Sequence, residues 1–270
     1  MATAPEKPTR RVTVILGTGG SSEALLELVL PLLGAERDVE MQGVFLEEAE
    51  VQHAAELPFV KELCRVTFSV REFTSDQFER ALTLRMRTAR RALSVLARRT
   101  GVQHSFRNVR GSAVRMVRDT AADSDITVFA PSRLMSPGAP PPGRRQQRIA
   151  VVIEDAAMAS RVLSAAGRLA EGRLDRLTLL LTPEAAADRE AIDRQVGRAA
   201  PGVLLRIREL PGSDPGSVAA AAAARAEGST LLVVGASDAM MDVRSLHALR
   251  QGSSCPVCLV RRWADDAATD

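Results

Sequence analysis

Two stretches, Arg11-Val-Thr-Val-Ile-Leu16 and Arg148-Ile-Ala-Val-Val-Ile153, determine the fold that the sequence predicts. Each is a β-branched run without polar alternation, which is typical of a strand buried on both faces of a parallel sheet. Each is followed by small residues and then by a helical stretch. Strands that alternate with helices in this way predict right-handed crossovers and a doubly wound α/β sheet.

Further landmarks recur in the two halves at equal spacing. Gly111-Ser112 leads through a helix to a strand that ends at Ser132. Gly216-Ser217 leads in the same way to Ser237, and the interval is 21 residues both times (132 − 111 and 237 − 216). We therefore expect two α/β units in tandem, with one large sheet of coincidental similarity as the alternative.

The predicted units cover 10–132 and 148–262, and a Pro- and Gly-rich linker joins them at 133–147. Five strands are expected in the second unit, at 148–154, 176–182, 203–209, 230–235 and 256–261. Four are expected in the first, at 11–16, 39–46, 104–110 and 125–130. Helices are expected at 75–99, 156–171, 184–199, 216–227 and 243–251, with a further helical segment near 47–63 interrupted at Pro58. The first sheet, truncated to about four strands, leaves an edge that something must cover.

Composition excludes several classes of protein. A hydrophobic fraction of 46% and a charged fraction of 26% predict a globular chain. The longest apolar runs fall far short of the roughly 20 residues of a membrane span, and the first residues do not resemble a signal peptide. Three cysteines give no disulfide framework, so we expect a cytoplasmic location. A net charge of only +3 and an aromatic content of 3% disfavour nucleic acid as a partner.

Other candidate signals favour structural interpretations. Cys255-Pro-Val-Cys258 has redox or metal spacing, but it enters a strand, where residues three apart point to opposite faces. The arginines of the helix at 75–99 could contact nucleic acid or an acidic partner, and a solvated helix face is the favoured interpretation. No serine, histidine or carboxylate arrangement indicates catalysis or a metal site.

The sequence resembles the tandem universal stress proteins. The residues that carry the resemblance are Val151-Val-Ile-Glu-Asp155, Val233-Val-Gly-Ala-Ser237 and the closing strand Cys255-Pro-Val-Cys-Leu-Val-Arg261. The resemblance implies a Rossmann-like unit of the adenine nucleotide alpha hydrolase type, with a ligand crevice at the carboxyl ends of strands one and four. It also implies a role in stress response. Some members of the family bind ATP or related adenylates, and others do not.

Nucleotide-binding members of the family share a Gly-x-x-Gly stretch after strand four, where backbone amides approach the phosphates. Only Gly235 matches that stretch here, since the second glycine position is Asp238, and Ala130-Pro131-Ser132 stands in the first unit. Asp155 lies where binding members place an aspartate that contacts the base or ribose. The candidate nucleotide-binding residues of the second unit are therefore Asp155, Gly235 and Ser237.

A second candidate is the turn Gly17-Thr-Gly-Gly-Ser-Ser22, which follows the first strand and opens a helix. Gly17, Gly19, Gly20 and Ser21 could cradle a phosphate with backbone amides. The favoured alternative is a tight turn in which Ser21 or Ser22 caps the helix, because the motif lacks the remaining residues of a dinucleotide fingerprint or a P-loop.

Together these observations predict a non-catalytic regulatory or binding protein of the universal-stress type, with no metal and no expected cofactor. The alternative is an adenylate-binding module for ATP or AMP, at most a slow ATPase, that combines the candidates of both units. In that case Arg133 or Arg244 could compensate for the missing glycines. We also expect a homodimer through exposed sheet edges, namely the open edge of the first sheet and the strand at 256–261.

Overall fold

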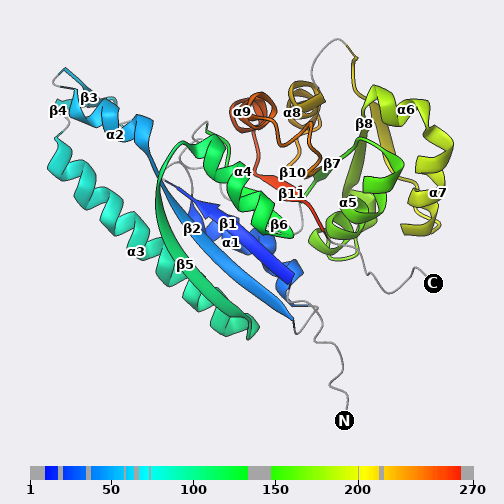
Figure 1. Cartoon of the computed structure of the whole chain (residues 1–270), viewed down its shortest axis with the longest axis horizontal. Helices are drawn as coiled ribbons and strands as arrows, with labels where there is room; N and C mark the ends of the chain where they lie inside the picture. Colours follow the sequence, from blue (N-terminus) through cyan, green and yellow to red (C-terminus); the bar gives the residue numbers. More distant parts are fainter. Residues whose placement is uncertain are drawn as a thin grey trace.

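The computed structural model describes residues 10–17, 21–34, 38–57, 59–63, 67–72, 74–132, 147–199, 201–212 and 216–262. Within them, the first half of the chain contributes strands β1 (Arg10–Leu16), β2 (Val39–Glu48), β5 (Gln103–Gly111) and β6 (Ile126–Phe129) to the main sheet. The second half contributes β7 (Ile149–Ile153), β8 (Leu177–Leu181), β9 (Arg206–Glu209), β10 (Leu231–Gly235) and β11 (Val257–Val260). All nine belong to one sheet of order β5-β2-β1-β6-β11-β10-β7-β8-β9 (Figure 1).

The two halves of this sheet have the same internal order. Reading from the outer edge, each half places its third, second, first and fourth strand side by side in parallel pairs, and the second half adds β11 as a fifth. The halves meet where β6 and β11 pair antiparallel, with Phe129 opposite Val257 and Ile126 opposite Val260. The doubly wound α/β fold is thus confirmed, and the two predicted sheets are joined edge to edge into one.

The edge that the sequence left open is covered from within the chain. β6, which ends the four-stranded first half, pairs with β11, which ends the second half. These are the two edges from which we predicted homodimerisation, and each already has its partner. The strands with an unpaired edge in the described sheet are instead β5 and β9.

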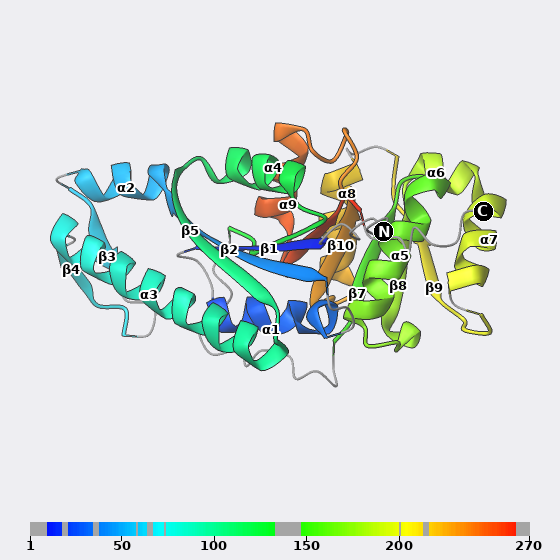
Figure 2. The same cartoon turned by 60° about the horizontal axis from the view of Figure 1, so that its bottom comes forward.

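Helices cover both faces of the sheet (Figure 2). One face holds α1 (Ser22–Leu33), α3 (Ser75–Thr100), α5 (Ala156–Leu169) and α7 (Arg189–Ala199). The other holds α4 (Ala113–Asp123), α8 (Gly216–Ala226) and α9 (Val243–Gly252). α1 packs against α5, and α4 packs against α9. The join between the halves is therefore closed by strands in the middle and by a helix pair on each face.

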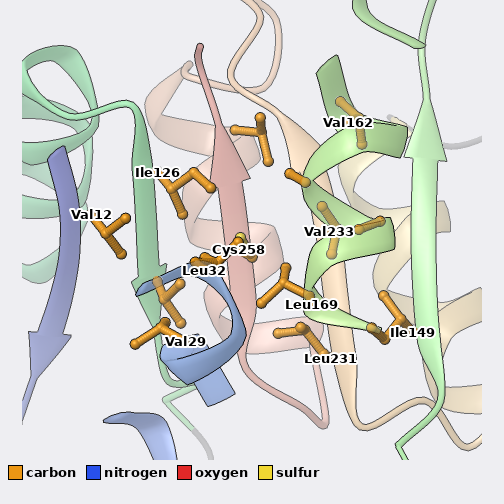
Figure 3. Close-up of a cluster of buried hydrophobic side chains, with 14 of the residues drawn as sticks. Val12, Val29, Leu32, Ile126, Ile149, Val162, Leu169, Leu231, Val233 and Cys258 are labelled. Atoms are coloured by element: carbon orange, nitrogen blue, oxygen red, sulfur yellow. The ribbon is translucent and has the colours of Figure 1, made fainter. Parts of the chain in front are cut away.

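Hydrophobic side chains from both halves form one continuous core at this join (Figure 3). Val29 and Leu32 of α1 and Leu169 of α5 pack over Ile126 of β6 and Cys258 of β11. All five side chains are buried. Burying apolar area contributes about 25 cal/mol per Å², so each half is stabilised by surface that the other half covers.

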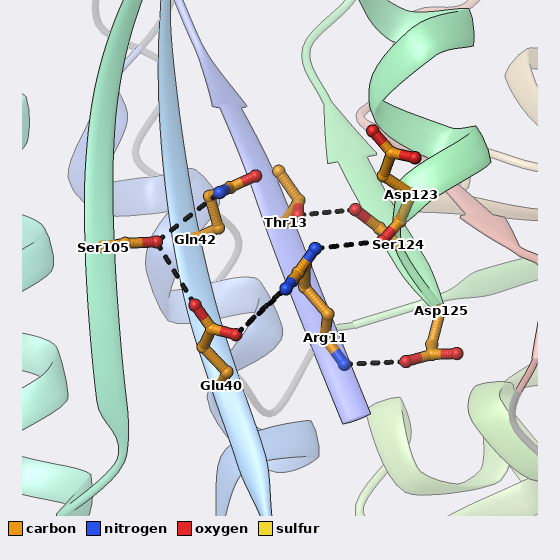
Figure 4. A network of polar contacts seen from close by, with 8 residues as sticks. All are labelled: Arg11, Thr13, Glu40, Gln42, Ser105, Asp123, Ser124 and Asp125. Carbon is orange, nitrogen blue, oxygen red and sulfur yellow. Dashed lines mark hydrogen bonds and ion pairs between the residues drawn. The ribbon is translucent and has the colours of Figure 1, made fainter. Parts of the chain in front are cut away.

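A polar network holds β1 between its neighbours at the amino ends of the strands (Figure 4). The backbone N–H of Arg11 donates to Asp125 Oδ2 at 2.7 Å, and the Arg11 guanidinium pairs with Glu40 at 3.4 Å. The hydroxyls of Thr13 and Ser124 lie 2.7 Å apart and are buried. Because buried polar groups need partners, these contacts favour one register of β1 against β2 and β6.

Two predicted helices differ from the structure. The segment near 47–63 is helical only in α2 (Ala49–Glu56); it then continues as β3 (Lys61–Leu63), which pairs with β4 (Val70–Glu72) in a small separate sheet. The helix predicted at 184–199 is divided into α6 (Pro183–Ala187) and α7, because Asp188 has φ −105° and ψ 42°, outside helical values. A short 3₁₀ turn at Leu174–Arg176 precedes β8. The predicted linker lies outside the described residues except for Gln147.

Candidate functional site

Because the two halves are joined by an antiparallel pair, the carboxyl ends of their strands point in opposite directions. The carboxyl ends of β7 and β10 lie on one side of the molecule, and those of β1 and β6 lie on the other. Asp155, Gly235 and Ser237 therefore lie together, as predicted, whereas Gly17 and Ser21 lie on the other side. The alternative hypothesis combined both groups in one adenylate site, and the structure does not bring them together. Gly19 and Gly20 lie outside the described residues.

Asp155 is the exposed N-cap of α5. Its Oδ1 accepts a hydrogen bond from the backbone N–H of Met158 at 2.7 Å. Aspartate is a preferred residue at this position because its carboxylate satisfies an otherwise free amide at the helix start. Its position at the strand end thus has a structural reason as well as a possible binding role.

Glu154, the residue before it, points a carboxylate into the protein. Its Oε2 is buried without a hydrogen-bond partner among the described residues. Burial raises the pKa of Glu154, the neighbouring carboxylates of Asp155 and Glu184 raise it further, and the Ser237 hydroxyl partly lowers it. The carboxyl ends of β7 and β10, where the family resemblance predicts a crevice, thus hold a carboxyl group of raised pKa beside the exposed acidic side chains of Asp155 and Glu184.

One methionine side chain lies near this carboxyl group, and a second lies near Gly216. A Cβ at Gly235 would lie 2.8 Å from Met158 Cε and 3.7 Å from Glu154 Oε2. On the other side, a Cβ at Gly216 would lie 3.5 Å from Cε of Met240, which is itself buried. Thioether side chains are adaptable fillers of irregular gaps. The absence of a side chain at Gly235 therefore lets the terminal methyl group of Met158 pack closely here, which differs from the phosphate-approach role implied by the family resemblance.

The loop after β10 uses its backbone amides internally. Four N–H groups at the crevice each donate to an acceptor of the chain itself: Ala236 to the Val260 carbonyl (2.9 Å), Met240 to Ser237 Oγ (3.2 Å), Met241 to the Ser237 carbonyl (2.9 Å) and Arg244 to Asp242 Oδ2 (2.9 Å). Ser237 and Asp242 thus act as caps of the loop and of α9. Asp238, at the second glycine position of the family motif, is exposed at the same place.

A second buried polar atom lies at the start of α8. Ser217 is only 2% exposed, and its Oγ has no hydrogen-bond partner among the described residues. The adjacent Gly216 packs near Thr182, whose hydroxyl donates to the Glu154 carbonyl at 3.3 Å. In the sequence, Ser217 stands out only as a repeat landmark and Glu154 only as part of a family motif. The position of Glu154 directly after a buried strand was the signal that could have identified it.

At the carboxyl end of β1, the described residues Gly17 and Ser21 have structural contacts. Ser21 is the N-cap of α1, and its Oγ accepts from the Ala24 N–H at 3.3 Å. The nearest atom to a Cβ at Gly17 would be the Leu46 carbonyl oxygen, 3.9 Å away. What these contacts show is a capped helix start.

An arginine from the second half reaches this side of the molecule. Arg250, in the last turn of α9, pairs with Glu48 at the end of β2 at 2.6 Å, and its carbonyl accepts from the Ser132 N–H at 2.8 Å. The sequence had suggested Arg133 or Arg244 as compensating cations. Arg133 lies outside the described residues, and Arg244 is exposed at the start of α9. Arg250 was missed, because no local pattern links it to Glu48.

The two described cysteines lie in the core, as the strand periodicity predicted. Cys258 packs on the face covered by α5, and Cys255 packs on the face covered by α9. Burial raises the pKa of Cys255 to about 11 and that of Cys258 to about 12, so both thiols stay protonated at neutral pH. Within the described part of the chain, no three His, Cys, Asp or Glu side chains are arranged to hold a metal ion. No helix in that part is both long enough and apolar enough to cross a bilayer.

Comparison with known proteins gives similarity at the level of structure. No protein-family profile and no curated protein sequence matches the chain. Similar solved structures include a universal stress protein from Archaeoglobus fulgidus (12% identity, TM-score 0.48, 93% of this chain and 98% of the other). A candidate universal stress protein from Pseudomonas aeruginosa has 12% identity, a TM-score of 0.45 and 93% coverage of both chains. A P. aeruginosa protein of unknown function has 11% identity, a TM-score of 0.40 and coverages of 93% and 92%. The fold assignment rests on the strand order described above.

Proposed function

We propose that the chain is a non-catalytic regulatory or binding protein of the universal-stress type that does not bind ATP through a glycine-rich loop. One observation carries the proposal: four backbone amides after β10, those of Ala236, Met240, Met241 and Arg244, already donate to Ser237, Asp242 and Val260. A phosphate gains about 1.5–3 kcal/mol from each amide donor that it meets. At these four positions each such bond would first require the loss of an existing one.

Charge supports the same proposal. Asp155, Asp238 and Glu184 are exposed carboxylates near the crevice, and Glu154 lies within it. Together they would repel a triphosphate entering between β7 and β10. Methionine packing at Gly235 and Gly216 leaves little room for close approach of an anion to the backbone.

Isothermal titration calorimetry with ATP and AMP tests this proposal. We expect no binding at micromolar concentrations of either nucleotide. Micromolar binding that Asp155→Ala abolishes would overturn the proposal and favour the adenylate-binding alternative. Because Asp155 also caps α5, Asp155→Ser is the matched variant: it retains a capping oxygen and removes the carboxylate.

Homodimerisation through sheet edges stays a prediction, and it now concerns the edges of β5 and β9. β5 carries Arg107 and Arg110, and charged side chains on an edge strand oppose pairing with a second copy. β9 is charged as well, with Arg206, Arg208 and Glu209 among its four residues, so the prediction does not single out one of the two edges. Light scattering at micromolar concentration tests this expectation, and a monomer would contradict it.

We also retain the proposed cytoplasmic location. It is supported by Cys255 and Cys258, which are both free thiols in the structure. Disulfides persist in oxidising compartments and are rare in the cytosol. Fractionation of the native cell, followed by detection of the chain with an antibody, tests the location directly.

A further inference from the structure

The strongest charge asymmetry of the molecule lies at the β5 end of the sheet. From Arg80 to Arg118 the sequence contains eleven arginines and no aspartate or glutamate. All eleven are exposed, on α3, β5 and α4. Since the whole chain carries only +3, the rest of it is net negative. Arg99, Arg110 and Arg118 pair with carboxylates, and the excess positive charge of the others attracts an anionic partner over a distance of about a Debye length.

Four of these arginines form a straight line on α3. At about 100° per residue, Arg80, Arg87, Arg91 and Arg98 fall within about 40° of one another around the helix and span about 27 Å along it. The buried side chains Ala89, Leu93 and Leu96 lie on the opposite side. The line therefore runs along the middle of the solvent-facing surface.

Other arginines of this region pair with a ring or a carboxylate, and among the described residues those on the line have no such partner. Arg90 lies over the Phe106 ring at 6.0 Å, and Arg99 pairs with Glu27 at 2.7 Å. By contrast, no ion pair joins the four aligned arginines to a carboxylate within the part of the chain that the structure describes. Their charges are not used to stabilise the described fold.

Apolar side chains interrupt the same line. Leu84 is 67% exposed and Val95 is 56% exposed, and both lie beside the aligned arginines. The resulting spacing of 4, 3, 4, 4 and 3 residues is that of a seam along which a second helix can pack. Near its start the surface is hollowed by about 490 Å³, and the lining consists of Asp76, Glu79, Arg80, Thr83, Leu84 and Arg87. The two carboxylates lie at the amino end of the helix, so the arginines from Arg87 onward carry the attraction for an anionic partner.

We propose that this seam docks an amphipathic acidic helix of a partner protein. The α3 seam consists of Arg80, Leu84, Arg87, Arg91, Val95 and Arg98. Carboxylates of the partner pair with the guanidinium groups, and its apolar side chains cover Leu84 and Val95.

The composition of the seam distinguishes this partner from other occupants. A nucleic-acid backbone would match the charges but would leave Leu84 and Val95 uncovered, and the seam has no aromatic side chain on which a base could stack. A second copy of α3 would bring arginine against arginine, which is repulsive. An amphipathic acidic helix pairs its carboxylates with the arginines and covers Leu84 and Val95 with its apolar side chains.

Fluorescence anisotropy with the full-length chain tests the proposal. The probe is a labelled synthetic helix about 20 residues long, the length of the seam, with leucines at alternating three- and four-residue spacing and glutamates beside them. Replacing its glutamates by glutamines gives the control peptide. We expect saturable binding of the acidic peptide that weakens with salt, and little binding of the control.

Matched protein variants locate the binding. R87E/R91E should weaken binding at least about tenfold, since two attractive pairs become repulsive. R194E/R198E on α7 makes the same charge change at the same spacing on exposed residues and should leave binding unchanged. L84S/V95S should also weaken it, whereas a purely electrostatic contact would not respond. Circular dichroism checks that each variant is folded. R87Q/R91Q replaces R87E/R91E if that variant is not folded.

Several outcomes would overturn the proposal. They are failure of the acidic peptide to bind, binding that R87E/R91E leaves unchanged, and no response to L84S/V95S. Tighter Arg87- and Arg91-dependent binding of a single-stranded DNA of about 20 nucleotides, or of phosphatidylserine vesicles, would assign the seam to a different class of partner.

Discussion

At the end of β7, Glu154 and Asp155 are neighbours in the chain but lie in opposite environments. Asp155 is exposed and caps α5. Glu154 is directed inward, where burial raises its pKa and its Oε2 has no partner among the described residues. An acidic residue after a buried strand is visible in the sequence, but which of two adjacent carboxylates turns inward depends on tertiary packing. The sequence therefore predicted that Asp155, Gly235 and Ser237 lie near one another and not that Glu154 is buried.

Glu154→Gln tests the cost of this buried carboxylate. A pKa raised by folding means that the stability contributed by the carboxyl group is fully present below the unfolded value of 4.5 and is lost as pH rises through the folded value. The glutamine side chain stays neutral at every pH, so Glu154→Gln does not lose stability in this way. We expect the variant to unfold at higher urea concentration than wild type at about pH 8, and the difference to disappear near pH 4.

The exposed Glu209→Gln on β9 is the control for the same chemical change. It should give no comparable pH-dependent difference from wild type. If Glu154→Gln were no more stable than wild type at alkaline pH, desolvation would not be the main cost at this site.

Gly235→Ala tests the methionine packing. The new Cβ would lie 2.8 Å from Met158 Cε, so the methionine must shift, and we expect a loss of about 1 kcal/mol in the free energy of unfolding. Adding Met158→Ala should make the pair less destabilised than the sum of the single variants, as urea unfolding of all three will measure.

Gly197→Ala in α7 provides the contrast, since nothing lies within 4 Å of its Cβ position. Alanine there should stabilise the helix by about 0.5–1 kcal/mol. Equal stability of wild type and Gly235→Ala would show that the crevice has space beside Gly235.

At the scale of elements, α9 connects the carboxyl end of β10 to the carboxyl end of β6. It begins beside the crevice at β10, where Asp242 caps it, and ends beside β6, where Arg250 contacts the first half. β11, which follows it, pairs with strands of both halves. One helix and one strand of the second half thereby cover the side of the first half that has no fifth strand.

The Arg250–Glu48 pair should contribute measurably to this connection. Both side chains are less than one-fifth exposed (17% and 18%), so removing one partner leaves a poorly solvated charge. We expect Arg250→Gln to cost about 1–3 kcal/mol and a double-mutant cycle with Glu48→Gln to show coupling of about 1 kcal/mol.

The comparison pair is Arg189–Asp193 on α7, 2.9 Å apart with both side chains about half exposed. Its coupling should be no more than about 0.5 kcal/mol. Equal couplings for the two pairs would mean that Arg250 is a surface contact without a special role in joining the halves.

At the scale of the whole molecule, local patterns predicted the strands well and the join poorly. All nine predicted strands of the main sheet lie close to their observed bounds, including the mostly exposed outer strands β5 and β9, and the strand-end rule brought Asp155 and Gly235 together. The β6–β11 pairing joins residues more than 120 positions apart and leaves no local pattern. β3 and β4 were also missed, because Leu63 and Val70 are exposed and show no core periodicity.

Fragments test whether the halves depend on each other. Residues 1–132 alone would expose the buried edge of β6 and the faces of α1 and α4 that α5 and α9 cover. We expect this fragment to aggregate or to lack cooperative unfolding, and co-expression with residues 133–270 to restore a folded complex. A soluble fragment that unfolds cooperatively on its own would contradict the dependence.

Native mass spectrometry, on chain purified without added nucleotide and then titrated with ATP, tests most directly whether this protein works without an adenylate. We predict the mass of the unmodified 29.0 kDa polypeptide, or a whole multiple of it, before and after the titration. A stoichiometric increment of one adenylate per chain, lost in Asp155→Ser, would contradict an acidic crevice whose amides are already engaged.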